Sequence, residues 1–213
     1  MIKSILIMLI IAVLLLNCQT NAKNQGQREL LPHPEKYIHD GYLELHDSIK
    51  PQFKPDSMIG PISLIDPTHV EAYLGGNVKS RLIEDDGLPN ASVISSDSKQ
   101  RFRFYFHFGN GENDYSEFEV SYVQHIATND IRIKDQEFAT ENGIKLGMTM
   151  GALRALKGEP HSMTENETTT FYYKIDNYDT SEFLLKYNMP VYYAHYEFSN
   201  GYLIAFKFGF EYP

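Results

Sequence analysis

Phenylalanine alternates with polar residues or tyrosine along residues 101–108. Successive side chains of a β-strand point to opposite faces, so this period of two predicts a strand with one buried, phenylalanine-rich face. The same alternation returns along residues 191–198, and a return strand is predicted after each stretch. The return strands carry Phe118, Val120 and Tyr122 in the first case and Tyr202, Ile204, Phe206, Phe208 and Phe210 in the second.

A short helix is predicted ahead of each alternating stretch. The first begins at Asp66-Pro67, a good N-cap followed by proline, and the second begins at Thr149 and ends at Gly158. Their apolar stripes are Val70, Tyr73 and Leu74 in the first helix and Met150, Leu153 and Leu156 in the second. Hydrophobic residues make up 42% of the 213-residue chain, which is enough to build a core.

Helix and strand landmarks therefore recur in the same order, and we predict a tandem repeat with repeat 1 over residues 56–138 and repeat 2 over residues 139–213. The predicted fold class is α+β: two short-helix plus antiparallel-sheet units, with the helices packed on one sheet face. Chance similarity between two ordinary α+β hairpins is the alternative. Further strand candidates are residues 171–175 and 182–187 and, more weakly, residues 92–95. For the last hairpin, the parity of the aromatic residues favours a three-residue loop that pairs Phe198 with Tyr202.

The N-terminus has the pattern of a secretory signal. Lys3 precedes twelve uninterrupted apolar residues, Ile5 to Leu16, and then come Asn17 and Cys18. As a helix this apolar stretch covers about 18 Å, short of the roughly 30 Å hydrocarbon core of a bilayer, so a membrane-spanning helix is the weaker alternative.

Cys18 is the only cysteine, and it lies where the lipobox of bacterial lipoproteins has its acylated residue. Asn17 departs from the small residue usual before that cysteine, so a chance cysteine after a differently cut leader is the alternative. The resemblance implies a signal peptide over residues 1–17, a lipid anchor such as palmitate on Cys18, and a polar, Pro-rich tether over residues 18–55. It places the chain in the bacterial cell envelope, and Gln19 in place of aspartate points to the outer membrane.

Repeat 2 resembles a known module. Residues 143–149 read GIKLGMT, residues 158–160 read GEP, and residues 196–203 read YEFSNGYL. These motifs are similar to those of β-lactamase-inhibitory-protein-like domains and of SmpA/OmlA-type outer-membrane lipoproteins. The two predicted repeats would then be a tandem of this module. The resemblance implies binding of a partner on a concave sheet face, or a contribution to an envelope complex.

Several functional classes are disfavoured. A net charge of −9 lacks the positive field that nucleic-acid binding needs. The chain has no nucleophile, zinc-hydrolase, P-loop or dinucleotide motif, so we predict no enzyme and no cofactor, with an unrecognised hydrolase as a minor alternative. His33, His39 and His46 lie among carboxylates, but their spacing matches no metal motif, so we predict no metal site. Metal or small-ligand binding remains the alternative function.

The strand faces opposite the core define a candidate partner-binding surface. Its residues are Arg103, Tyr105 and His107 from repeat 1 and Tyr193, His195 and Glu197 from repeat 2. Tyrosine and arginine are enriched at protein interfaces, although an ordinary half-polar sheet surface is the alternative. We therefore predict a non-catalytic protein-binding module whose partner is an unidentified envelope protein.

Overall fold

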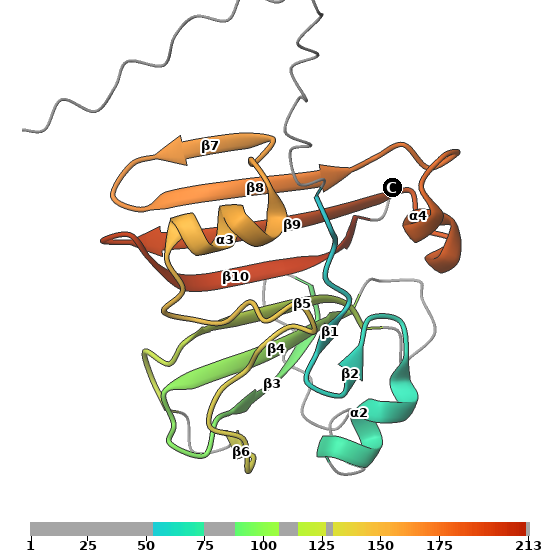
Figure 1. Ribbon diagram of the computed structural model, residues 1–213. Helices are drawn as coiled ribbons and strands as arrows, with labels where there is room; N and C mark the ends of the chain where they lie inside the picture. Colours follow the sequence, from blue (N-terminus) through green and yellow to red (C-terminus); the bar gives the residue numbers. More distant parts are fainter. Residues whose placement is uncertain (1–52, 75–87, 107–114, 127–129, 212–213) are drawn as a thin grey trace, which may run out of the picture. The chain divides into compact units, whose positions relative to one another are not determined.

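In the computed structural model, the structure describes residues 53–74, 88–106, 115–126 and 130–211. These ranges hold a two-stranded sheet, an eight-stranded sheet and three short helices (Figure 1). The strands are β1 (Met58–Ile59), β2 (Ile62–Ser63), β3 (Asn90–Ile94), β4 (Gln100–Phe106), β5 (Tyr115–Tyr122), β6 (Ile131–Arg132), β7 (Ser162–Glu165), β8 (Thr169–Ile175), β9 (Val191–Ser199) and β10 (Tyr202–Glu211). The helices are α2 (Pro67–Leu74), α3 (Met150–Lys157) and α4 (Glu182–Tyr187).

The predicted fold class, α+β with helices packed on one sheet face, is wrong, because the described part of the chain is mostly β. Helix α3 lies across β9 and β10 (Figure 1), but α2 packs chiefly against β2. Over β3–β5 the cover comes from the β1–β2 hairpin and from irregular chain that includes Phe138 and Ile144. These apolar residues follow no helical period, so their role as a covering layer left no mark in the hydrophobic pattern.

The eight strands run in the order β6-β3-β4-β5-β10-β9-β8-β7. Strands β3–β4–β5 and β8–β9–β10 each form an antiparallel meander, and β5 pairs antiparallel with β10 to join the two into one sheet. At this seam Phe118 lies opposite Phe208, and Val120 lies opposite Phe206. The two predicted repeats consequently do not separate into two compact units.

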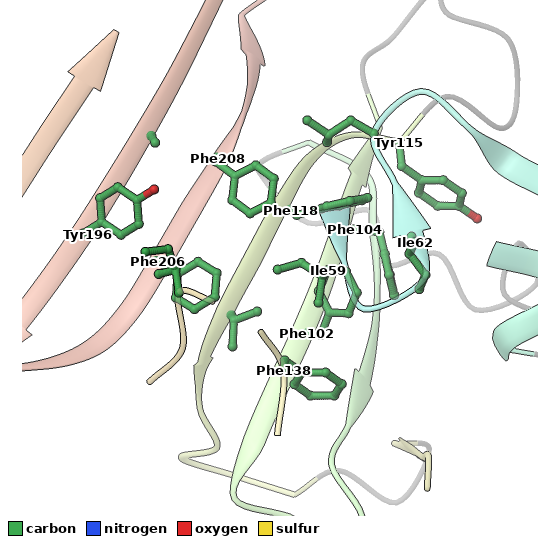
Figure 2. Packing of buried hydrophobic residues seen from close by; sticks show 14 of the residues in the cluster. Ile59, Ile62, Phe102, Phe104, Tyr115, Phe118, Phe138, Tyr196, Phe206 and Phe208 are labelled. Carbon is green, nitrogen blue, oxygen red and sulfur yellow. The ribbon is translucent and has the colours of Figure 1, made fainter. Parts of the chain in front are cut away.

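The buried face of the sheet is the one that the alternation predicts. Phe102 and Phe104 on β4 and Tyr196 on β9 are all at most 1% exposed. Figure 2 shows Ile59 and Ile62 of the β1–β2 hairpin packed over the phenylalanines of β4 and β5, while Phe206 and Phe208 continue the layer on β10. Tyr122 and Tyr202 are exceptions: both lie at strand ends and are exposed.

The predicted three-residue loop between β9 and β10 is wrong. Ser199 pairs with Tyr202, so the turn is the two-residue loop Asn200-Gly201, and both of its residues have positive φ. This geometry suits a tight hairpin of Asn-Gly type. A register shift between Leu203 and Ala205 then changes the parity, so that Phe206 lies opposite Tyr196. The bulge thus puts Phe206 and Tyr196 on the same face, which the predicted three-residue loop would also have done.

The predicted strand over residues 182–187 is instead helix α4. The Ser181 side chain caps its first turn by accepting a hydrogen bond from the Leu184 amide, and Asn188 ends it in the left-handed conformation. Helix α3 begins and ends as predicted, at the N-cap Thr149 and at Gly158.

The buried stripe of α3 differs from the predicted one. Leu153 and Lys157 are its buried residues, while Leu156 is exposed. The Lys157 ammonium lies 2.7 Å from Asp56 Oδ2, and both side chains are fully buried. The Tyr196 hydroxyl and the Asn142 amide donate to the same carboxylate at 2.9 Å each. The ion pair fastens the chain just ahead of β1 to α3, and the Tyr196 hydrogen bond fastens it to β9.

Candidate binding surface

The open face is the side of the eight-stranded sheet opposite the phenylalanines. The strand register aligns one residue from each of five strands in a row across it. The row consists of Arg103 on β4, Glu119 on β5, Lys207 on β10, His195 on β9 and Tyr172 on β8. The seam between β5 and β10 therefore brings polar residues of both meanders onto one surface.

One side of this row is an ion pair reinforced by a tyrosine. The Arg103 guanidinium lies 2.5 Å from Glu119 Oε1, and the Tyr105 hydroxyl donates to Glu119 Oε2 at 2.6 Å. Burial raises the pKa of Tyr105, and the negative charge of Glu119 raises it further. Tyr105 is thus a neutral donor at physiological pH, and Glu119 is held from two sides.

A second cluster surrounds Lys207. Its ammonium lies 2.5 Å from Glu117 Oε2 and 4.2 Å from the centre of the Tyr105 ring. The Tyr193 hydroxyl also hydrogen-bonds Glu117, and burial is the main cause that raises the pKa of Tyr193. Tyr193 is only 7% exposed, so it belongs to the framework of the open face and offers a partner little free surface.

His195 is the exposed member of the row. Its ring centre lies 5.1 Å from that of Tyr193 and 4.8 Å from that of Tyr172. Partial burial lowers the pKa of His195, and the positive charge of Lys207 lowers it further. The neutral form of the ring is therefore favoured at this position.

A hollow of about 830 Å³ lies beside the Arg103–Glu119 pair. Its floor comes from β4, β5, β9 and β10, and its wall comes from the chain that follows β5. The lining includes the charged residues Arg103, Glu119 and Glu197 and the apolar or aromatic residues Tyr122, Ile126 and Ile204. Tyr122 and Ile126 are exposed, so the hollow has an apolar lip beside a charged floor.

Arg101 fixes the wall of the hollow. Its guanidinium donates to the carbonyl oxygen of His125 and to Asp130 Oδ2, each at 2.9 Å. The Arg101 and Asp130 side chains are largely buried, so this ion pair is well shielded from solvent. Residues 122–126 are thereby held against β4.

The structure places four of the predicted contact residues on the open face: Arg103, Tyr105, His195 and Glu197. Tyr193 is there too, but buried. His107, Cys18, the leader over residues 1–17 and the three tether histidines lie outside the described residues. Sequence reasoning overlooked Glu117, Glu119 and Lys207, although their alternation with Phe118, Val120 and Phe206 placed them on the same face.

The described residues contain no group of three or more metal-ligating side chains. None of the helices in the described ranges has both the length and the apolar character needed to span a bilayer. No family model, no curated protein and no solved structure matches the chain. The resemblance to β-lactamase-inhibitory-protein-like and SmpA/OmlA-type domains therefore stays a prediction.

Proposed function

We propose that this protein is a non-catalytic binding protein that takes a partner protein on its open face. The observation that carries the proposal is the hollow of about 830 Å³ beside a row of paired polar and aromatic side chains. The described covering elements α3, α4 and the β1–β2 hairpin pack against the opposite face. The open face thus combines a fixed shape with exposed apolar residues at its lip.

The fixed charges of the surface favour recognition of a folded or extended partner without rearrangement. Arg103 and Glu119 are already paired, and Lys207 is held by Glu117. A preorganised surface costs less side-chain entropy on binding than one whose long side chains move freely. Aromatic and arginine side chains are also the residue types that contribute most at protein interfaces.

Site-specific photo-crosslinking tests the proposal. A photoreactive amino acid replaces Ile126 at the lip of the hollow, and the matched control replaces Leu185, which is similarly exposed on α4. We expect a protein adduct of discrete mass from position 126 in the native cells and none from position 185. Equal adducts from both positions, or none from position 126, would contradict the proposal.

Small-ligand binding is a second candidate, because a volume of about 830 Å³ lies within the range of small-molecule sites. Native mass spectrometry of protein purified from its own cells distinguishes it. A small ligand would appear as a co-purified species of low mass bound to the wild type. It should be lost from Ile204→Glu, whose larger, charged side chain occupies the floor of the hollow.

We also propose that the chain is anchored by lipid on Cys18 in the cell envelope, at the outer membrane. The leader, the position of this single cysteine and the polar residues after it support the anchor. Metabolic labelling with a clickable palmitate analogue should mark the wild type and not Cys18→Ala, and the variant should leave the membrane fraction. Equal labelling of both would refute acylation at this residue.

A further inference from the structure

The charged side chains that line the hollow do not all have an ion-pair partner. Arg101 is paired with Asp130, and Arg103 is paired with Glu119. Glu197 also lines the hollow, where it is half-buried on β9 opposite Ala205 and Thr170. Among the described residues it is the one carboxylate of the lining with no ion pair or hydrogen bond to its side chain. The floor therefore carries one uncompensated negative charge.

From this charge we infer that the hollow receives a lysine or arginine side chain from a basic, extended segment of the partner protein. The inference rests on the proposed function and names the chemistry of the partner at the same site. The long aliphatic stem of either side chain suits the apolar contacts of Tyr122, Ile126 and Ile204, while its charged end reaches the carboxylate of Glu197. The neighbouring cations do not compete for Glu197, because each is already held by its own carboxylate.

The charge of the whole chain points the same way. A net charge of −9 steers basic partners toward the protein and repels acidic ones. His125, the histidine of the lining, is exposed on the wall, and its carbonyl oxygen accepts a hydrogen bond from Arg101. An acidic segment would bring its carboxylates beside Glu197 without a free cation to receive them.

A displayed library of random peptides, selected on the full-length chain, tests the inference. We expect wild type to enrich peptides that carry lysine or arginine beside apolar residues, and Glu197→Gln to lose that preference. Glu197→Lys should favour acidic peptides instead. The matched control is Glu182→Gln, an identical loss of charge on the exposed first turn of α4, which should select the same basic peptides as wild type.

A synthetic peptide from the selection gives the size of the effect. Glu197→Gln should weaken its binding roughly three- to fivefold, the range of a partly exposed ion pair, and added salt should weaken wild type more than the variant. Enrichment of neutral or acidic peptides, no enrichment at all, or retention of basic peptides by Glu197→Gln would each overturn the inference. If any of these results were obtained while position 126 still crosslinked to a partner, the proposed function would stand, and only the inference of a basic segment would be wrong.

Discussion

At the scale of single residues, the least expected feature is the charged pair inside the core. Asp56 and Lys157 are both fully buried, and the Tyr196 and Asn142 side chains complete the hydrogen bonding of the carboxylate. Burial lowers the pKa of Lys157, and the neighbouring Asp56 opposes that shift. A lysine is tolerated on the buried side of α3 because Asp56 pairs with its ammonium group.

Removing one member of this pair should be costly. We expect Lys157→Met to lower the free energy of unfolding by about 3–5 kcal/mol, because Asp56 is left buried without its counter-ion. The matched control is Lys145→Met, whose partner Glu137 is half-exposed, and there the loss should stay within about 1 kcal/mol. Urea denaturation measures both, and similar losses in the two variants would show that the pair at Lys157 is not special.

His195 should make stability depend on pH. The pKa of His195 in the folded protein lies below the ordinary histidine value of about 6.5, so the unfolded chain takes up a proton first as the pH falls. The free energy of unfolding should therefore decrease as the pH falls from about 6.5 toward the lowered value, and be unaffected by this group at higher pH. His195→Gln should flatten that part of the profile between about pH 7 and pH 5, and a profile parallel to wild type would contradict the shift.

At the scale of elements, the seam between β5 and β10 depends on a close approach. A Cβ atom on Gly209 would lie 2.2 Å from the carbonyl oxygen of Ser116 and 2.6 Å from the Cα atom of Glu117. Gly209 lies opposite Glu117 in the ladder, so the two backbones meet where no side chain fits.

Gly209→Ala should lower the free energy of unfolding by about 1–3 kcal/mol, because backbone atoms on β5 must move to admit the methyl group. The same substitution at Gly151 on α3 meets nothing within 4 Å and should raise stability by roughly 0.5 kcal/mol. Thermal unfolding followed by circular dichroism compares the two. Tolerance of alanine at Gly209 would mean that the seam is looser than the structure shows.

Elements were predictable from the sequence where one residue type repeats with a clear period. Alternation gave the buried faces of β4 and β9, and capping residues gave both ends of α3. Residues 182–187 alternate weakly, but the capping residues Ser181 and Asn188 decide for a helix. A bulge near Ile204 reverses which face the following side chains occupy, and the hydrophobic pattern does not reveal it, so the predicted three-residue loop is wrong.

The candidate surface was predictable in part for the same reason. Parity placed Arg103 and Glu197 on the open face, and it would also have placed Glu119 and Lys207 there. The pairing of β5 with β10 joins residues far apart in the sequence, and the alternation carries no information about it. The hollow and the isolation of Glu197 follow from that pairing and could not be predicted without it.

At the scale of the whole molecule, the eight-stranded sheet of the described ranges is built around two meanders that share one seam. Repeat 2 alone would expose Phe206 and Phe208 along the seam, because β10 would lose its partner β5. It would also lack Asp56, the partner of Lys157. The two halves therefore stabilise each other across the sheet and across the buried ion pair.

We expect a fragment of residues 139–213 to remain unfolded, while a fragment of residues 53–213 unfolds in a single transition. Differential scanning calorimetry of both fragments measures this, with agreement between the calorimetric and van't Hoff enthalpies as the mark of one cooperative unit. Two separate transitions in the longer fragment would mean that the meanders fold independently. A folded shorter fragment would lead to the same conclusion.

The position of Asp56 also has a mechanical consequence. It lies two residues after Lys54, whose carbonyl oxygen accepts a hydrogen bond from the Lys157 ammonium at 2.5 Å, and three residues after Phe53, whose ring stacks on Tyr173. Among the described residues, a pull from the N-terminal side loads the Phe53 and Asp56 contacts before it loads β1 and β2. Under the proposed lipid anchor on Cys18, tension on the chain would act on the Phe53 stacking and on the Asp56–Lys157 ion pair with its surrounding hydrogen bonds. Rupture of these contacts would release the β1–β2 hairpin from the aromatic layer that it covers.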